Sequence, residues 1–346
     1  MSKKKDLKFL LLTFILLIVV VLVPVFLDEP TSFLNQSKID TRPTPTPAPS
    51  TKITFAGDMM LDRLVYSRYK NQGLEKIFEN FPPNFFKTTN IAVLNLEGPI
   101  SSEDIIDDVS PDNLIFNFPK QTPDLLKFLG ITHVTLANNH TLNDSFSGLK
   151  RTRNVLADSG ISSFGHPSRL DDTSSIRVDA PVPISLIGIN LLSEIDMDGV
   201  SALIQREKTE ERFVSVFVHW GSEYQIKHSA HQEALAHQLV EFGADTVIGS
   251  HPHVVEDSEI YQNKLIVYSL GNFVFDQLFS IETQTGCIVS LEIEKKSIKA
   301  KFIPILIKNI KVTLLEGEDR SKVLERVIPS QGFSKLLGDD TILISN

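Results

Sequence analysis

Short runs rich in β-branched residues alternate with helical patterns, and six of the runs end in turns that carry polar, metal-binding types of side chain. The helical patterns cover residues 148–158 and 231–242, each followed by a glycine that can end a helix. Strands alternating with helices predict an α/β domain. The six runs cover residues 53–56, 91–94, 133–136, 213–218, 246–248 and 264–268. Ligands of α/β sheets bind outside the carboxyl ends of strands, so we expect these turns to share a pocket.

The side chains in these turns are of the types that bind transition metals. They are Asp58, Glu97, Asn139, His140, His219, His251 and His253. Imidazoles, carboxylates and an amide oxygen suit Mn, Fe or Zn better than Mg or Ca. The single cysteine, Cys287, excludes a thiolate cluster. We predict a site for divalent transition-metal ions, and in a two-metal site a carboxylate can bridge the ions. Each residue taken alone is equally typical of a capped turn or a structural histidine.

Two histidine pairs lead to opposite expectations. An extended His251-Pro252-His253 segment would point both imidazoles to one side, because side chains alternate along a strand, and the proline stiffens it. That geometry suits two ligands of one ion, or one ligand for each of two ions. His231 and His237 lie six residues apart on a helical pattern and share no face, so we expect both to be solvated.

The amino-terminal segment predicts membrane attachment. Residues 9–27 are almost wholly apolar and follow four lysines, Lys3, Lys4, Lys5 and Lys8. Such a stretch spans a bilayer, and its basic flank stays in the cytoplasm. Residues 1–28 are therefore interpreted as a cytoplasmic basic stub and transmembrane signal-anchor. The body then lies outside the cytoplasm, held to the cell membrane by a single pass. A cleaved signal peptide is the alternative, although no small-residue cleavage site follows. Residues 29–51 form a Pro/Thr-rich linker.

The charge distribution bears on the partner. The net charge is −9. Four lysines and one aspartate give the first eight residues +3, which leaves −12 for the rest. An acidic body argues against nucleic acid, because phosphate contacts need a basic surface. A small phosphate ester is not excluded, since bound metal ions supply local positive charge.

Six ordered sequence blocks carry a family resemblance. They are Gly57-Asp58-Met59-Met60-Leu61, Asn95-Leu96-Glu97, Asn138-Asn139-His140, His219-Trp220-Gly221-x-Glu223, Gly249-x-His251-Pro252-His253 and Tyr268-Ser269-Leu270-Gly271-Asn272-Phe273. Over residues 52–310 the chain resembles the bacterial CapA-type poly-γ-glutamate capsule biosynthesis proteins, which are similar to the calcineurin-like metallophosphoesterases. The resemblance implies a sandwich of two mixed β-sheets flanked by helices, with a dinuclear site at the strand ends. It leaves residues 311–346 as a tail of undetermined structure.

The resemblance also implies roles for single residues. Asp58 matches the first-block aspartate, and Glu97 stands where the superfamily has a bridging aspartate. Asn139 matches the asparagine ligand and His140 the catalytic histidine, while the later histidine ligands correspond to His219, His251 and His253. Glu223 and Asn272 belong to the CapA-like pattern as accessory residues. The first block departs from Asp-x-His, because Met60 occupies the histidine position. Asp62 is the residue that we expect to compensate.

Three functions are consistent with this sequence. The first is a metal-dependent hydrolase or transferase acting on an envelope polymer such as poly-γ-glutamate, with other capsule-synthesis membrane subunits as partners. The second is a non-catalytic polymer-binding or export component in which the metal is structural. The third is an extracytoplasmic metallophosphatase. Turnover by the isolated protein separates the first and third from the second.

Overall fold

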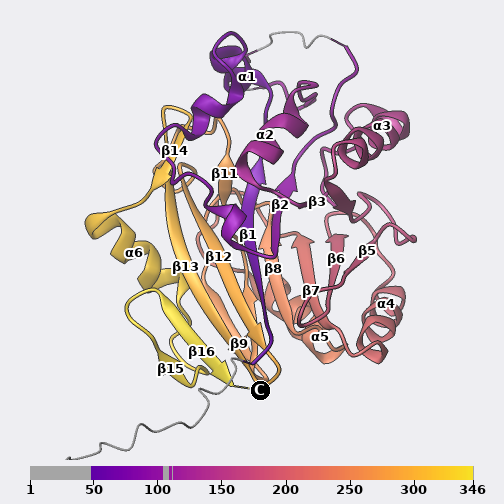
Figure 1. Ribbon diagram of the computed structural model, residues 1–346, viewed down its shortest axis with the longest axis vertical. Helices are drawn as coiled ribbons and strands as arrows, with labels where there is room; N and C mark the ends of the chain where they lie inside the picture. Colours follow the sequence, from indigo (N-terminus) through magenta and orange to yellow (C-terminus); the bar gives the residue numbers. More distant parts are fainter. Residues whose placement is uncertain (1–47, 104–108, 111, 346) are drawn as a thin grey trace, which may run out of the picture. The chain divides into compact units, whose positions relative to one another are not determined.

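Two mixed β-sheets form the centre of the fold (Figure 1). The first has the order β15-β16-β13-β12-β1-β2-β3-β4, with β11 beside β1 and β14 beside β13. The second has the order β5-β6-β7-β8-β10-β9. The strands of the first sheet are β1 (Ser50–Met59), β2 (Ile91–Leu96), β3 (His133–Thr135), β4 (Ser162–Phe164), β11 (Asn272–Val274), β12 (Thr285–Glu294), β13 (Ser297–Lys308), β14 (Lys311–Leu314), β15 (Lys335–Leu336) and β16 (Thr341–Ser345). Those of the second are β5 (Ser175–Val178), β6 (Ile184–Asn190), β7 (Phe213–His219), β8 (Thr246–Ser250), β9 (Ser258–Tyr261) and β10 (Lys264–Val267).

The structure is a computed structural model that describes residues 48–103, 109–110 and 112–345. The predicted membrane anchor at residues 1–28 and the linker up to residue 47 lie outside this range, so the anchor stays a prediction. Within the described ranges, every helix is too short or too polar to cross a lipid bilayer.

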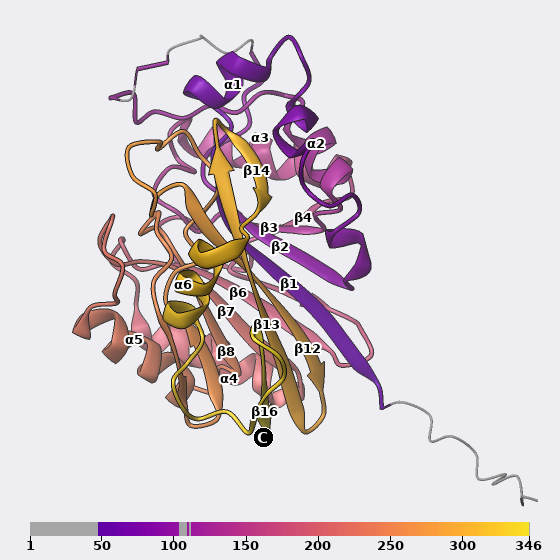
Figure 2. The same cartoon turned by 90° about the vertical axis from the view of Figure 1, so that its left-hand side faces the viewer.

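Five of the six helices in the described residues pack on the outer faces of the two sheets. The helices are α1 (Arg63–Tyr69), α2 (Thr122–Leu129), α3 (Ser145–Asp158), α4 (Met197–Thr209), α5 (Ala230–Glu241) and α6 (Gly317–Val327), with 3-10 turns η1 (Leu74–Phe78) and η2 (Phe86–Thr88). One hydrophobic cluster joins α1, α2 and α3 to the first sheet, and another joins α4 and α5 to the second (Figure 2). A third lies between the sheets and includes α6. The predicted sandwich of mixed sheets flanked by helices is confirmed.

Burial on both faces explains the apolar runs seen in the sequence. In β2, Ile91 and Val93 face the cluster between the sheets, whereas Ala92 and Leu94 face the helices. A strand covered on both sides needs apolar residues at every position, unlike a strand with one solvated face. The parallel strands β2, β6, β7 and β8 are buried along their whole length and are mostly apolar, and polar side chains are concentrated at their carboxyl ends.

The carboxyl-terminal part of the chain completes the first sheet. Two late apolar runs, residues 287–294 and 298–307, predict a β-hairpin, and the structure confirms it, because β12 and β13 pair antiparallel from the Thr285–Leu306 pair to the Glu294–Ser297 pair. The residues after 310, whose structure the sequence left open, add β14 and β16 to the two ends of β13. Helix α6 packs against the same sheet through Val323, Leu324 and Val327. These residues are therefore part of the folded body.

Close backbone approach shapes the end of β1. The pairing of β1 with β2 shifts register between Ala56 and Asp58. At Gly57, which lies between them, an added Cβ would sit 1.9 Å from the carbonyl oxygen of Gly271. Only glycine fits there, because the obstructing atom is backbone and cannot rotate away. The shift lies immediately before the aspartate that the sequence singled out.

Candidate metal centre

The structure brings the predicted site residues together at one edge of the two sheets. Their positions are Asp58 in β1, Glu97 after β2, Asn139 and His140 after β3, His219 at the end of β7, and His251 and His253 after β8. Two groups of potential ligands form there, and within each group the ligand atoms all lie within 4.8 Å of one another. One is Asp58, Glu97 and His219, and the other is Glu223, His251 and His253.

The first group is fully buried and is held by an amide. The Asn95 side-chain nitrogen lies 2.8 Å from Asp58 Oδ1 and 3.2 Å from Glu97 Oε2, and it donates to both. A second amide orients the first, because Asn138 donates to Asn95 Oδ1 at 2.9 Å. Two carboxylates brought this close in a buried site repel each other, and the shared donor offsets part of that repulsion.

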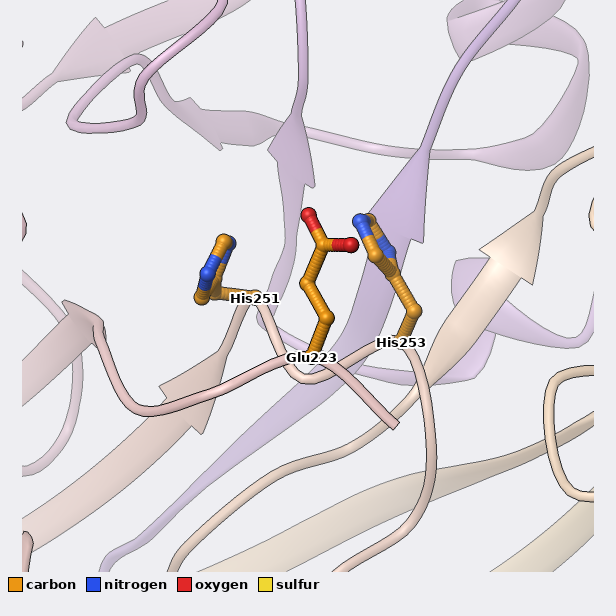
Figure 3. Close-up of side chains that lie close together, drawn as sticks. All are labelled: Glu223, His251 and His253. Carbon is orange, nitrogen blue, oxygen red and sulfur yellow. The ribbon is translucent and has the colours of Figure 1, made fainter. Parts of the chain in front are cut away.

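The second group combines an exposed carboxylate with two buried imidazoles. The Glu223 carboxylate lies between the rings of His251 and His253 (Figure 3). His253 Nδ1 lies 3.0 Å from Asn272 Oδ1, and its Nε2 lies 3.6 Å from Glu97 Oε1. Asn272, an accessory residue in the sequence pattern, is therefore an orienting partner of His253. The contact between His253 and Glu97 makes the two groups continuous.

The backbone of the His-Pro-His segment differs from the expectation. His251 and His253 have φ angles of 98° and 58°, so the segment is not extended and the alternation argument was wrong. Their ring centroids are nevertheless only 5.9 Å apart. In residues other than glycine, such φ angles cost roughly 1–3 kcal/mol of conformational free energy, and they are concentrated at functional sites. The His251 N–H also donates to Asp58 Oδ2 at 3.2 Å, which ties this loop to β1.

Asn139 lies beside the first group. Its Oδ1 is 2.9 Å from His219 Nε2, and Asn139 itself is exposed. The two atoms are hydrogen-bonded to each other, and both are of the types that bind transition metals. On its other side, His219 Nδ1 lies 3.0 Å from Ser250 Oγ, which fixes the ring.

His140 borders the cluster and is not a member of either group. Its Nδ1 lies 3.1 Å from both Leu114 O and Asn143 Oδ1. Both partners are acceptors, so Nδ1 carries the proton and Nε2 is directed to the cluster, 4.0 Å from Glu97 Oε1. The ring packs on Phe116 at a centroid distance of 4.3 Å. Burial lowers the pKa of His140.

The electrostatics of the cluster fit a bound divalent cation. Burial, followed by the charge of Asp58, raises the pKa of Glu97 well above its ordinary value. Burial lowers the pKa of His219, and that of His251 to about 4, which keeps both imidazoles in the neutral form that binds metals. For His253, burial is outweighed by Glu97 and Asp58, and the pKa rises to about 9. The clustered carboxylates thus attract positive charge.

Two buried atoms in the cluster have no hydrogen-bond partner among the described residues, and both belong to predicted ligands. They are Glu97 Oε1 and His251 Nδ1. A buried polar atom without a partner costs about 1–3 kcal/mol, and most such atoms in proteins are satisfied by a ligand, an ion or water. These two atoms, together with the neutral imidazoles, are what a nitrogen- and oxygen-ligated ion would engage.

The structure also shows how the chain departs from the Asp-x-His pattern. Met60 is buried, and its sulfur accepts the backbone N–H of Asp62 at 3.0 Å. Asp62 accepts from the backbone of Arg63 and of Asn117, each at 2.7 Å, and caps α1. Asp62 therefore does not join either group of ligand atoms. The extra carboxylate in the cluster comes from Glu223.

Sequence reasoning gave no role to two residues that build the site. Asn95 belongs to a quoted sequence block, but only the fold places its amide between Asp58 and Glu97. Arg63 is buried, pairs with Asp276 and lies 5.1 Å from the Phe116 ring, which packs on His140. No signal in the sequence points to Arg63, because every one of these contacts is long-range.

The fold and site define an α/β protein with a buried histidine–carboxylate cluster at the strand ends. The family described as "Bacterial capsule synthesis protein PGA_cap" matches residues 52–190 and 170–277. This chain therefore belongs to that family of bacterial capsule synthesis proteins.

Individual relatives agree with the family. The capsule biosynthesis protein CapA of Bacillus anthracis is 29% identical over 247 residues, which cover 65% of this chain and 60% of that protein. The PGA biosynthesis protein CapA of Bacillus subtilis is 28% identical over 259 residues, or 70% and 67% of the two chains. The match thus spans about 60–67% of the length of these relatives. Among solved structures, a Vps29 single mutant from Entamoeba histolytica covers 64% of this chain and 95% of its own, with 12% identity and a TM-score of 0.31, too low to support a conclusion.

Proposed function

We propose that this chain is a membrane-anchored, metal-dependent hydrolase or transferase that acts on an acidic envelope polymer of the poly-γ-glutamate type. Three observations support the proposal: the family membership, the ligand cluster and the apolar amino-terminal segment. The relatives are named for capsule and PGA biosynthesis, which indicates the class of polymer. The chain would work at the cell membrane, with its body outside the cytoplasm and with membrane subunits of capsule synthesis as partners.

The contact of Glu97 with both histidines is the observation that carries the proposal. Glu97 Oε1 has no hydrogen-bond partner in the part of the chain that the structure describes, and it lies 3.6 Å from His253 Nε2 and 4.0 Å from His140 Nε2. The first group, the second group and the catalytic histidine therefore converge on one buried oxygen. When bound, divalent ions such as Mn, Fe or Zn would act as Lewis acids that polarise a carbonyl group of the polymer. Asp58, Glu97, Asn139, His219, Glu223, His251 and His253 would hold them.

The residues of the chain do the rest of the chemistry. His140 keeps a proton on Nδ1 through Leu114 and Asn143, which leaves Nε2 to exchange a proton with the reacting group. Asn95 and Asn272 keep the ligands in position through hydrogen bonds to Asp58 and His253. Glu223 and Asn139 are the exposed members of the cluster, so the substrate approaches from their side.

An acidic body that binds an acidic polymer requires local positive charge. Bound divalent ions provide it at the cluster, where carboxylates of the polymer can approach them. Under this proposal, both polymer binding and turnover depend on the bound metal. It also separates this function from simple surface adsorption, which the charge of −12 outside the first eight residues would oppose.

The test uses the full chain in detergent, stripped of metal and then reloaded with Mn²⁺ or Zn²⁺. Shortening of poly-γ-glutamate is followed by size-exclusion chromatography, and phosphodiester hydrolysis is measured in parallel. We expect metal-dependent shortening that is lost in His140→Ala and His251→Ala and retained in His231→Ala, an exposed control. Shortening that all three variants retain would refute the proposed site. Polymer binding without turnover, abolished by a chelator, would indicate a binding component, and turnover of phosphodiesters alone would indicate a phosphatase.

A further inference from the structure

A second cluster of histidine and carboxylate side chains lies between helix α5 and strand β9. Glu233 and His237 stand one turn apart on α5, and Glu259 comes from β9. Their ligand atoms all lie within 4.8 Å of one another. Residues four apart on a helix share a face, so the helix alone brings Glu233 and His237 together. Strand β9 then presents Glu259 to that face.

The His237 ring is held in a fixed orientation. It stacks on Tyr261 with a centroid distance of 3.7 Å and an interplanar angle of 8°. Its Nε2 lies 2.6 Å from Glu259 Oε1, and the Tyr268 hydroxyl donates to the same oxygen at 2.6 Å. The expectation that His237 is solvated was therefore wrong, because β9 covers it, whereas His231 is exposed as expected. A locked ring and a hydrogen-bonded carboxylate are features of supported metal ligands.

A second histidine adjoins the cluster with an independent sign of ligation. His228 Nδ1 lies 2.9 Å from Asp257 Oδ1, and the ring stacks on Tyr268 at 3.8 Å. His228 Nε2 faces Glu233 Oε2 at 4.0 Å. A metal-binding histidine almost always gives its other ring nitrogen to a carboxylate or carbonyl, which fixes the tautomer with the free lone pair toward the ion. Asp257 does this for His228.

A pair of ordinary surface ion pairs is the competing explanation. It would account for His237 with Glu259 and for His228 with Asp257, each contributing little. It does not account for Glu233, which lies between the two histidines and has neither as a close hydrogen-bond partner. The side chain of Glu233 is 47% exposed, so burial alone does not hold it between the two histidines. The convergence of Glu233, His237 and Glu259 therefore needs another cause.

We infer that Glu233, His237 and Glu259 form a second divalent-metal site, of the kind that binds Zn²⁺, with His228 as an adjacent fourth ligand. Imidazole and carboxylate ligands from a helix and a strand suit zinc, which takes three or four such groups. The ion would link α5 to the edge strand of the second sheet. This inference does not depend on the proposed catalytic function, because it uses none of the strand-end residues.

The first test counts ions in the full chain. The detergent-solubilised protein is stripped with a chelator, reloaded with Zn²⁺, desalted and analysed for zinc per chain. His237→Ala is expected to lower the count by one, as is Glu259→Gln, whereas His231→Ala leaves it unchanged. An equal zinc count in the parent protein and the His237→Ala variant would overturn the inference. Because truncation at α5 could also disturb folding, Glu233→Gln, a conservative change at an exposed helix position, is measured beside them.

The second test separates this site from the strand-end cluster. In a His251→Ala background, where the strand-end cluster has lost a ligand, one Zn²⁺ that depends on His237 is expected to remain. The Asp257 side chain hydrogen-bonds only to His228 among the described residues. Isothermal titration with Zn²⁺ should therefore show a roughly 10–100-fold larger dissociation constant for this ion in Asp257→Asn. Affinity unchanged by Asp257→Asn and by His228→Ala would remove His228 from the site. Loss of all zinc in His251→Ala would show that the ions belong to one centre and refute the second site.

Discussion

The two histidine–carboxylate clusters of this chain use the same residue types but are built by different physical means. The strand-end cluster joins residues far apart in sequence, from Asp58 to His253, and it is mostly buried. Two of its buried polar atoms lack a hydrogen-bond partner among the described residues. Two of its histidines, His251 and His253, have φ angles of 98° and 58°. The α5/β9 cluster joins residues 228–259, is partly exposed, and has each histidine stacked on a tyrosine.

The difference shows what each arrangement costs and what it can do. A buried set of polar atoms without hydrogen-bond partners is unstable by itself and is kept only because the surrounding fold holds it, which is a property of sites that perform chemistry. In the α5/β9 cluster, which is partly exposed, the histidines already have carboxylate hydrogen-bond partners. Such a cluster can bind an ion but stores little backbone strain. We therefore expect changes in the first cluster to alter turnover and changes in the second to alter zinc content.

The largest effect is expected for His140, the proposed catalytic histidine. His140→Ala should lower kcat on the polymer by about 10²–10⁴-fold, because the general acid–base group is lost. Zinc or manganese content should stay unchanged, since His140 belongs to neither ligand group. Steady-state kinetics and metal analysis on the same sample check both statements. A variant that loses metal together with activity would make His140 a ligand and enlarge the strand-end cluster.

A smaller effect is expected from the amide that supports the carboxylates. Asn95→Ala removes the donor shared by Asp58 and Glu97, and metal affinity or activity should fall about 10–100-fold. The zinc equivalent that depends on His237 should be unaffected. Titration with Mn²⁺ and Zn²⁺ measures the change. An equal loss of metal affinity at both clusters would mean that the substitution acts through general unfolding. The proposed difference between the two clusters would then be refuted.

Backbone packing under the strand-end cluster gives the third prediction. In Gly57→Ala the new Cβ would meet the carbonyl oxygen of Gly271, and we expect a loss of about 1–3 kcal/mol in the free energy of unfolding. Gly160→Ala is the control, since nothing lies within 4 Å of its Cβ, although its φ of +75° costs about 1 kcal/mol. Urea unfolding compares the two. A Gly57 variant as stable as the Gly160 variant would show that β1 has room to move.

The smallest effect is expected at the hydrogen bond that joins helix α5 to the loop after β8. Gln232, which caps α5 with Ser229, donates to the buried Glu256 at 2.8 Å. Burial raises the pKa of Glu256 to about 8. The folded state thus keeps a proton that the unfolded chain releases near pH 4.5, so stability is lost as the pH rises from roughly 5 to 8.

Glu256→Gln should abolish this loss, because the amide resembles the protonated acid and does not titrate. Unfolding free energies at pH 5 and pH 9 should therefore differ less in Glu256→Gln than in the parent chain. The exposed Glu325→Gln serves as the matched control and should keep the parent's pH dependence. The same slope in all three proteins would show that Glu256 is ionised in the folded state and that α5 is held in another way.

Much of the fold could be predicted from local sequence. The hairpin β12–β13, the strands β6 and β7 and the helices α3 and α5 follow from apolar periodicity and end signals. The short or weakly patterned elements could not be predicted this way. Strand β9, for example, is partly exposed along its whole length and is defined by its pairing with β10.

For the strand-end cluster, the sequence by itself determined which residues stand at strand ends, because chemistry-bearing side chains must follow apolar runs. It also determined the family, through ordered blocks. Only the tertiary structure decided the orientation of His251 and His253, the capping role of Asp62 and the placement of Glu223 and Asn95. The physical reason is that these depend on pairing between distant strands and on left-handed backbone angles. Neither strand pairing nor a left-handed backbone angle produces a periodic pattern of residue types in the sequence.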